Sequence, residues 1–477
     1  MRARRARPLF GLACLAALLA CLLTPASASA HGIVGRADLP IPAWLFAWTA
    51  TAVMVISFVA LWRLWSKPQL QRPPGRVLLR VPRPVEWLCG AVGIALFAIV
   101  IYAGLAGEQN FTSNLAPTFI YVIFWVGIPI ASAFVGDVFR PLNPWRALGR
   151  LTGWLLGKRR SASDGEERGG LLGSYPSSWG RWPAAATLLC FAWLELVYPS
   201  KDDPSLLATL MLVYGGVQLV GMAAFGVEEW CERADGFGVY FGLIARLSPL
   251  SWRDRELRLR RPLSGLGDLE LWPGTAAVIF VLIGSTSFDG FSQKSDWNSI
   301  EPHLQTFFSN LGANTEHSVE LAFTVGLVAA VLIIAGFYRV GVLGMRSLGG
   351  HSTRELAERF VYTLVPIALA YVIAHYFSLF AYQGQAVSYL ASDPLGNGSN
   401  IFGTATSQIN YNIVGANGVW YTQVAALVIG HAAGLTLAHD RALVVYRRVR
   451  EATRSQYWML AVMVGFTSLA LWILSGN

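Results

Sequence analysis

The apolar residues of this chain fall into ten blocks, separated by connectors that are rich in arginine, glycine or proline. At ~1.5 Å of rise per residue, a helix over such a block is long enough to cross most or all of a ~30 Å hydrocarbon layer. The pattern predicts an all-α fold, a polytopic transmembrane helix bundle in one domain over residues 31–477. The predicted spans are 41–63, 84–106, 116–136, 183–199, 205–226, 272–290, 319–343, 361–383, 419–438 and 457–475.

Basic residues alternate between the connectors and so predict the direction of each span. Arginine and lysine gather after the odd-numbered spans, as in 64–83 and 233–261, and they are absent from 107–115 and 384–418. Because connectors rich in lysine and arginine stay in the cytoplasm, every odd-numbered span is expected to exit there. The prediction is a multi-pass plasma-membrane protein whose mature N-terminus and C-terminus both lie outside.

Composition supports a membrane protein and removes the need for a nucleic-acid partner. Hydrophobic residues make up 54% of the 477 residues and charged residues only 14%, with a mean hydropathy of +0.46. A soluble domain carries nearly twice that charged fraction. The net charge of +9 comes from the basic connectors, so the expected partner is the lipid bilayer with its anionic lipids.

Residues 1–30 have the three parts of a signal peptide. MRARRAR is basic, LFGLACLAALLACLL is apolar, and TPASASA ends in small residues at the positions that signal peptidase accepts. Cleavage after Ala30 would make His31 the new N-terminus. The alternatives are an uncleaved signal anchor and a lipoprotein modified at Cys21, for which Leu19 fits the usual motif poorly.

Two predicted cytoplasmic connectors contain apolar stripes. In NPWRALGRLTGWLLGK, Asn143 can cap a helix whose first residue is Pro144, and GFGVYFGLIARLSPL (236–250) carries a similar stripe. Both segments predict interfacial helices lying on the cytoplasmic leaflet. Each follows an acidic residue, Asp137 or Glu228, after an outside-to-inside span. Either a two-helix repeat of roughly 95 residues or chance similarity between membrane sequences would explain this likeness.

Ionisable residues interrupt several spans. By the predicted directions, Glu195, Asp289 and His375 lie in the outer half of the bilayer or at its outer border, and His431 lies near the midplane. A charged group in hydrocarbon costs several kcal/mol unless it is paired or hydrated. These side chains are therefore expected to face the interior of the bundle and to find partners there. His439 is expected at the inner border as an interfacial anchor.

Histidine and carboxylate side chains are ligands that suit Zn or Cu, so a divalent metal is a candidate cofactor. The predicted catalytic residues, as ligands or general base, are His375, Glu195 and Asp289, and the predicted metal ligands are His375, His431, His317, Glu320 and His31. His317 and Glu320 are three residues apart and share a helix face. The alternatives are an interhelical hydrogen bond or a transport path for His375, and a solvated loop for His317.

The predicted outer loop 384–418 is longer than a connector requires and holds one charged residue, Asp393. It is expected either to fold back as a lid over an outward-facing cavity or to form an ordinary external loop.

Several segments together resemble a family of bacterial multi-pass membrane proteins whose members are often labelled fenitrothion hydrolase. They include HGIVGRADLPIPAWLF, VGDVFRPLNPWRALGRL, STSFDGF, HYFSLFAYQGQ, SDPLGNGSNIFGT and VWYTQVAALVIGHAAGLTLAHDRAL. The resemblance covers essentially the whole mature chain and implies a membrane-bound hydrolase of phosphotriesters. It supplies no catalytic residues, because the chain lacks the HxH, GxSxG and HExxH motifs of known hydrolases.

Three functions fit these observations. The first is a metal-dependent hydrolase of organophosphorus esters, because a metal supplies both a hydroxide and a positive centre for such a reaction. The second is a permease or metal-handling protein that uses the same polar residues on a small lipophilic substrate or solute. The third is a structural subunit, in which case a second subunit would be the partner.

Overall fold

The computed structural model describes residues 43–71, 75–155, 170–253, 255–346, 350–446 and 449–474. The predicted signal peptide, residues 1–30, and the predicted ligand His31 lie outside the described residues and stay predictions.

Helices occupy all ten predicted spans. Eight helical segments in the described chain are long and apolar enough to cross a membrane, which confirms a multi-pass helical bundle. The first and fourth predicted spans are not among these eight, because the apolar helical stretches found in them are shorter, Thr51–Leu64 and Trp182–Leu196. The count of ten spans therefore stays a prediction. The ten are α2 (Ala43–Leu64), α3 (Arg83–Ala106), α4 (Leu115–Thr118) continued by η2 (Phe119–Gly127) and α5 (Ile128–Val135), α8 (Trp182–Leu196), α9 (Pro204–Phe225), α12 (Thr275–Ser292), α14 (Thr315–Arg346), α16 (Val365–Gln383), α18 (Ala416–Val445) and α19 (Val449–Leu474).

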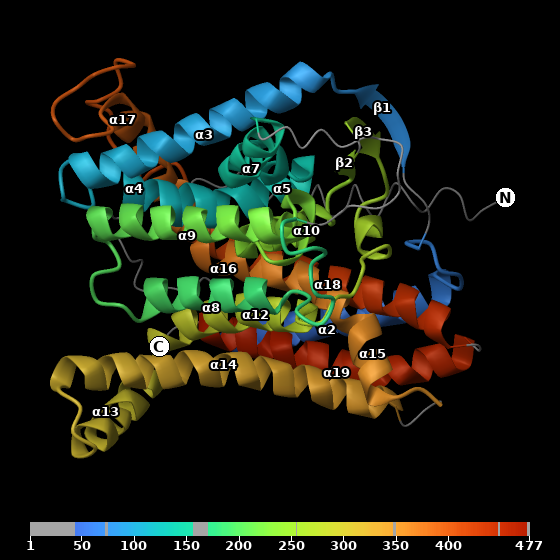
Figure 1. Cartoon of the computed structure of the whole chain (residues 1–477). Coiled ribbons are helices and arrows are strands. Elements are labelled where there is room, and N and C mark those ends of the chain that lie inside the picture. The colour runs from blue at the N-terminus through green and yellow to red at the C-terminus, as the bar shows by residue number, and fades with distance from the viewer. Residues whose placement is uncertain are drawn as a thin grey trace.

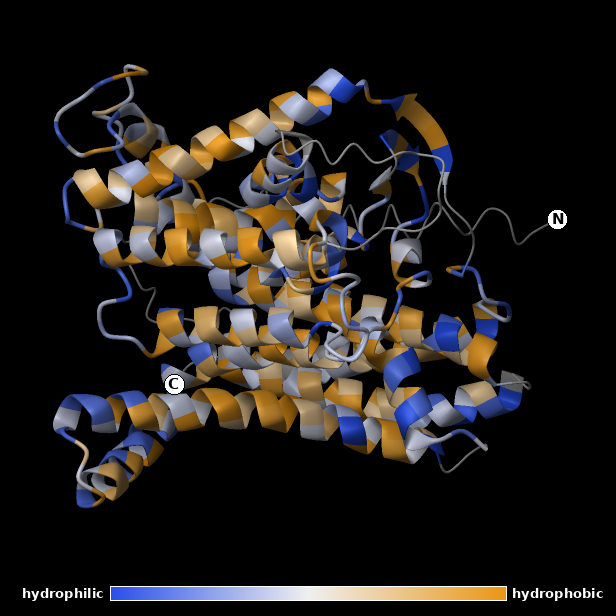
Figure 2. Cartoon of the chain, in the orientation of Figure 1, coloured by the Kyte–Doolittle hydropathy of each residue, from blue (hydrophilic) through white to orange (hydrophobic). Residues whose placement is uncertain are grey.

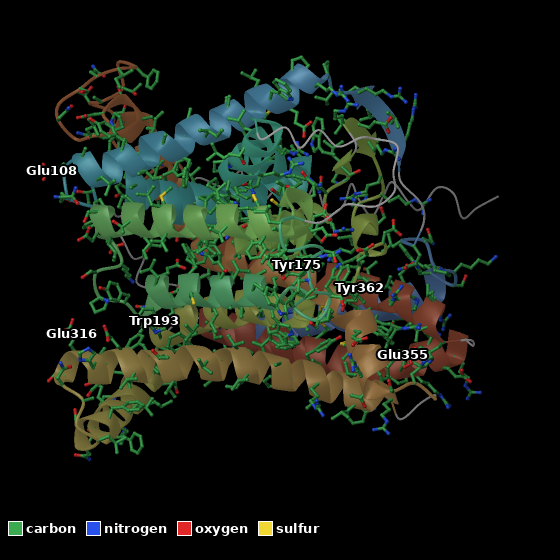
Figure 3. The ribbon with its side chains drawn as sticks, in the orientation of Figure 1. Glu108, Tyr175, Trp193, Glu316, Glu355 and Tyr362 are labelled. Atoms are coloured by element: carbon green, nitrogen blue, oxygen red, sulfur yellow. The ribbon has the colours of Figure 1, made fainter. Side chains whose placement is uncertain are left out.

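Successive spans run in opposite directions, so their connections gather at two ends of the bundle (Figure 1). We call one the arginine end, because it carries Arg63, Arg140, Arg261 and Arg346 and the short strands. We call the other the loop end; its connectors are 107–114, 197–203, 293–314 and 384–415. Figure 3 shows Glu108 and Glu316 at the loop end, and Glu355 and Tyr362 toward the arginine end.

The sides of the bundle are apolar, as a lipid-facing surface requires. Figure 2 shows apolar residues along the outer helices, while hydrophilic residues concentrate toward both ends. On α3, Trp87 is 74% exposed and Leu88 is 64% exposed. By contrast α12 is the most enclosed span, with 61% of its apolar window buried. The polar residues of α12 therefore face protein.

The third span is not a regular α-helix. Its middle, η2, is a nine-residue π-helix, and the amide of Ile128 donates to the carbonyl of Ile123, five residues earlier. π-helical turns are rare and occur frequently at functional sites. Here the wide turn brings Trp125, which is 2% exposed, into the core, and Gly127 lies directly against the ring of Phe380 on α16.

Two short helical hairpins enter the bundle from the arginine end and turn back near its middle. The first is α6 (Phe139–Leu142) with α7 (Pro144–Leu155), and the second is α10 (Val227–Arg233) with α11 (Gly236–Ala245). A glycine with positive φ precedes each hairpin, Gly136 (φ 88°) and Gly226 (φ 96°). Such a backbone conformation is readily adopted by glycine, so each of these residues permits the sharp reversal at the end of a span.

Contacts with neighbouring spans show how deep the hairpins reach. The carbonyl of Leu142 lies against Gly93, near the middle of α3, so closely that a Cβ there would be 1.8 Å from its oxygen. In the second hairpin, Trp230 Nε1 donates to Gln218 Oε1 of α9 (2.8 Å). Ser248, just after α11, is back at the arginine end, where its hydroxyl donates to the carbonyl of Phe134 (2.8 Å).

The prediction of two interfacial helices is therefore wrong in position. Nearly every residue of α11 is buried, including Tyr240 and Phe241, because its sequence is apolar on all sides and leaves no polar face for water. The first half of α7 is buried too, through Trp145 and Arg146, while Leu151 of its predicted apolar face is 46% exposed.

A small antiparallel sheet of strand order β1-β3-β2 closes the arginine end, and the sequence analysis did not predict it. Arg76 pairs with Leu259 and Leu250 pairs with the same residue from the other side. The remaining elements are short. The strands are β1 (Arg76–Arg80), β2 (Leu250–Arg253) and β3 (Glu256–Leu259); the other helices are η3 (Ser264–Leu266), α13 (Ser295–Asn310), α15 (Thr353–Phe360), η4 (Val361–Leu364), η5 (Gly384–Ala386) and α17 (Val387–Ser392).

The segment 384–415 is folded against the loop end. Gln385 and Asn410 exchange hydrogen bonds through side chain and backbone, and Tyr382 donates to the carbonyl of Val414 (2.7 Å). The amide of Glu108 donates to the carbonyl of Leu395, which holds the segment beside α3.

Candidate functional site

Four polar side chains from three spans meet in the half of the bundle nearer the loop end. Glu195 lies in the last turn of α8, Asp289 in the last turn of α12, and His375 and Tyr376 in the middle of α16. Trp193, labelled in Figure 3, marks this part of α8 and donates from Nε1 to Thr324 Oγ1 (2.8 Å). The three residues that the sequence analysis singled out as catalytic are thus neighbours in space.

The contacts form one chain of polar atoms. His375 Nε2 is 2.8 Å from Asp289 Oδ2. The hydroxyl of Tyr376 is 2.9 Å from the same Oδ2 and 3.2 Å from Glu195 Oε1. Adjacent helix residues point about 100° apart, which is why His375 and Tyr376 can reach Asp289 from different sides.

The single hydroxyl proton of Tyr376 limits how this group of four side chains can form hydrogen bonds. A phenol has one O–H to donate, yet Tyr376 lies within hydrogen-bonding distance of two carboxyl groups. If Tyr376 donates to Asp289, then Glu195 must carry a proton to bond to the phenol oxygen. In that arrangement one proton can pass along the hydrogen bonds between Glu195, Tyr376 and Asp289, as it does in intramembrane proton relays.

A small cavity adjoins His375. It has a volume of about 30 Å³ and is lined by residues of α12, α16, α18 and α19 that include Thr286, Ser287 and Tyr371. That volume and these hydroxyl groups suit one or two water molecules. Gly290 lies near His375 Nδ1, where a Cβ would be 3.5 Å away, so this nitrogen is on the cavity side of the ring. Nε2 bonds to Asp289, which leaves Nδ1 as the nitrogen that can exchange a proton with water.

His431 belongs to a neighbouring part of α18 and is fully buried. Its Nδ1 donates to the carbonyl of Leu427 (2.7 Å), and its Nε2 has no hydrogen-bond partner in the described chain. Its ring centroid is 6.3 Å from that of Tyr371, which lines the cavity. His431 thus packs next to Tyr371, with an Nε2 that has no partner among the described residues.

The other predicted ligands lie apart from this cluster. His317 is exposed at the start of α14, where its Nδ1 is 2.8 Å from Asn314 Oδ1. Glu320 follows one turn later on the same helix, where its backbone carbonyl accepts from Thr324 Oγ1. His317 and Glu320 thus make their contacts within α14 or with Asn314 just before it.

The described residues contain no group of three or more His, Cys, Asp or Glu side chains placed to hold a metal ion. His375 and Asp289 could offer one nitrogen and one oxygen, but Tyr376 stands between them and Glu195. The residues present therefore do not form the three-ligand set that a catalytic zinc site uses.

Tyr376 was missed by the sequence analysis, although it completes the chain. Tyrosine is common at membrane borders, so a tyrosine in a span carries little signal by itself. The recognisable sign was that a second polar side chain directly follows an intramembrane histidine.

A second buried polar network lies at the arginine end. Asp440 accepts from Trp65 Nε1 (2.9 Å), from the amides of Gln69 and Leu70, and from Gln71 Nε2 (3.2 Å). His439 contacts Gln456 Oε1 and the carbonyl of Trp65, each at 2.9 Å. The expectation that His439 is an interfacial anchor is wrong, since it is 1% exposed and ties α18 to α19 and to the segment after α2.

No protein-family profile matches the sequence, and neither a curated protein nor a solved structure matches it significantly. The evidence for a function therefore lies in the hydrogen-bonded side chains of Glu195, Tyr376, Asp289 and His375.

Proposed function

We propose that this protein is a multi-pass plasma-membrane permease that moves protons through the chain Glu195–Tyr376–Asp289–His375. The observation that carries the proposal is the hydroxyl of Tyr376, which lies within 3.2 Å of Glu195 and 2.9 Å of Asp289. Proton relays in pumps and transporters are built from connected Asp, Glu and His side chains inside the helix bundle. A structural hydrogen bond between helices would need only two of these four groups.

The same proposal assigns an orientation. Arginine concentrates at one end of the bundle, so we place that end in the cytoplasm and the polar chain in the outer half of the membrane. The mature N-terminus and C-terminus would then both lie outside. Glu195, near the outer end of α8, would exchange protons with the external side, and the cavity at His375 would continue the path inward through water.

A second candidate is a hydrolase of organophosphorus esters, as the resemblance implies. The observation that favours it is the Asp289–His375 pair. A carboxylate on Nε2 orients the ring and stabilises its cation, which leaves Nδ1 as a general base for a water molecule. In this version His375 generates the nucleophile without a three-ligand metal centre. A cavity of about 30 Å³ has no room for the ester, so the helices around it would have to separate.

The test uses purified protein in vesicles that contain a pH-sensitive dye, with an imposed potassium diffusion potential. We expect proton entry well above that of empty vesicles, and a loss of at least tenfold in Asp289→Asn. The matched control is Glu316→Gln. Glu316 is an exposed carboxylate on α14 at the loop end and is not one of the four side chains of the proposed relay. Wild-type entry equal to that of empty vesicles would refute the relay.

The same samples distinguish the second candidate. Turnover of a nitrophenyl phosphotriester is followed by the colour of the released phenol. Turnover that disappears in His375→Ala, together with absent proton entry, would favour the hydrolase over the permease.

A further inference from the structure

A larger pocket opens at the arginine end. None of its residues belongs to the helices that carry Glu195, Asp289, His375 and Tyr376. It is lined by Gln69, Gly75, Pro249, Leu259, Arg260, Arg261, Pro262 and Ser264, and its volume is about 520 Å³. We call it the sheet-end pocket, because it lies where β1 begins and β3 ends. It is large enough for a phosphate-bearing head group.

The two arginines of the sheet-end pocket supply a fixed and a free positive charge. Arg260 is held in place, since its Nε donates to the carbonyl of Ser248 and its Nη2 to that of Ala245, both at 2.9 Å. Burial and the nearby Arg246 lower the pKa of Arg260 to about 10, so it remains a cation near neutral pH. Its two bonds are to neutral carbonyl groups; Asp268 is near enough to favour its charged form, but no described carboxylate lies within ion-pair distance of it.

Arg261 is exposed and weakly held. Among the described residues its side chain makes one hydrogen bond, from Nη1 to Gln69 Oε1 at 3.4 Å, and no carboxylate there lies within ion-pair distance of it. Arg80 and Arg258, in the adjoining sheet, by contrast share one carboxylate, that of Glu256. The pocket arginines thus lack even this partial neutralisation.

The strand β1, which follows the pocket residue Gly75, is apolar and exposed. Val77, Leu78 and Leu79 of β1 are between 40% and 50% exposed, and Leu259, which lines the pocket, is 47% exposed. Figure 2 shows this strand as an apolar segment with hydrophilic residues at its ends. Exposed apolar side chains beside unpaired arginines are typical of a surface that sits at the boundary between head groups and acyl chains.

We propose that the sheet-end pocket binds the phosphate of an anionic phospholipid head group, in the leaflet at the arginine end, with the acyl chains lying along the exposed apolar residues of β1. This inference goes beyond the proposed relay and does not depend on it. Guanidinium groups suit phosphate because several N–H donors match its oxygens. The apolar strand favours a lipid over a free phosphate ion, which would gain nothing from Val77 and its neighbours.

The test is native mass spectrometry of the full-length protein in detergent, with phosphatidylglycerol or phosphatidylcholine added at equal concentrations. We expect phosphatidylglycerol to bind preferentially and Arg261→Gln to weaken that binding about fivefold. The matched control is Arg63→Gln, which removes one exposed arginine at the same end but does not line the pocket. Arg261 makes a single weak bond, so its replacement should leave the fold intact, which circular dichroism of the same samples checks.

The remaining outcomes overturn the proposal. Equal binding of the two lipids, or an equal loss in Arg261→Gln and Arg63→Gln, would mean that no specific site exists. A second arm adds millimolar inorganic phosphate as a competitor. If inorganic phosphate displaces phosphatidylglycerol at these concentrations, the pocket is a site for a soluble anion and the lipid assignment is wrong.

Discussion

The side-chain amide of Asn143 donates a 2.9 Å hydrogen bond to Oδ2 of Asp235, and this contact joins the turns of the two hairpins inside the bundle. Each residue is also the N-cap of the second helix in its own hairpin. Asn143 Oδ1 accepts from the amide of Arg146, and Asp235 Oδ1 accepts from the amide of Gly238 (3.1 Å). The predicted repeat thus has a counterpart in space, because equivalent positions in two similar units meet at their tips.

Asp235 should be the most sensitive polar residue of this junction. Besides Asn143 and Gly238, it accepts from Trp145 Nε1 (2.8 Å) and from the hydroxyl of Tyr214 (2.7 Å). Asp235→Ala leaves four buried donors without their acceptor, so we expect a loss of about 3 kcal/mol or more in the free energy of unfolding in detergent. Asn143→Ala should cost less, about 1–2 kcal/mol.

A double-mutant cycle checks that these two effects arise from one contact. Because the residues bond directly, the double variant should lose less stability than the sum of the single variants. Strict additivity would mean that the hairpin turns are stabilised independently.

The close approach of the first hairpin to α3 gives a second prediction. A Cβ on Gly93 would stand 1.8 Å from the carbonyl oxygen of Leu142, so Gly93→Ala must push α6 away from α3. We expect a loss of at least about 2 kcal/mol, measured by thermal unfolding in detergent. Gly216→Ala on α9 is the matched control, because no atom lies within 4 Å of its Cβ position. There the better helix propensity of alanine should leave stability unchanged or raise it by up to about 1 kcal/mol.

Tyr376→Phe removes one hydroxyl and breaks the polar chain between Glu195 and Asp289. We expect proton entry into vesicles to fall by about tenfold, whereas the apolar packing of the ring survives. The control is Tyr382→Phe, which removes the hydroxyl that donates to the carbonyl of Val414 at the loop end. Equal proton entry in the two variants would show that the phenol of Tyr376 serves only to hold helices together.

The ion pairs beneath the hairpins predict a pH dependence. Burial alone would raise the pKa of Glu228, but Arg146, Arg150 and Arg140 together lower it to about 2, against an ordinary value of 4.5. A depressed pKa means that the folded state binds the proton less readily than the unfolded state does. The stabilisation from Glu228 is therefore complete above pH 4.5 and disappears as the pH falls from there toward 2.

Thermal unfolding of wild type and Glu228→Gln, compared from pH 7 to pH 3, measures this effect. The variant should be clearly less stable at pH 7, and the difference should narrow below pH 4.5. Glu232→Gln is the control, because Glu232 contacts Arg140 alone and is 56% exposed. Its replacement should change stability by less than about 1 kcal/mol at any pH. A difference between wild type and Glu228→Gln that widens in acid would contradict the assignment.

Hydrophobic blocks and intramembrane charges were readable from the sequence because both obey rules of the bilayer as a solvent. Block length located the spans, and the cost of burying a charge led to the expectation that Glu195, Asp289 and His375 would find partners. Which partners they have depends on how spans approach one another, and no local pattern encodes that. The role of Tyr376 was hidden for this reason.

The hairpins were misread because the signal of α11 is ambiguous. A ten-residue apolar helix is too short to span and is apolar on all sides, so it fits a surface position poorly and a buried one well. Val239, Tyr240 and Leu243 form a stripe that favours an interfacial helix, but the residues between them are apolar as well. The sheet at the arginine end was missed because its strands have four or five residues and contain several arginines.

The hairpins also bear on the order in which the protein is made. None of their helices is long enough to span a membrane alone, since α6 has four residues, α7 twelve, α10 seven and α11 ten. Each hairpin can reach its buried position only when the span it packs against, α3 or α9, is in place. Asn143 cannot meet Asp235 until the ribosome has synthesised at least the 92 residues that separate them. The contact can therefore close only after Asp235 has been made, when about half of the 477-residue chain is complete.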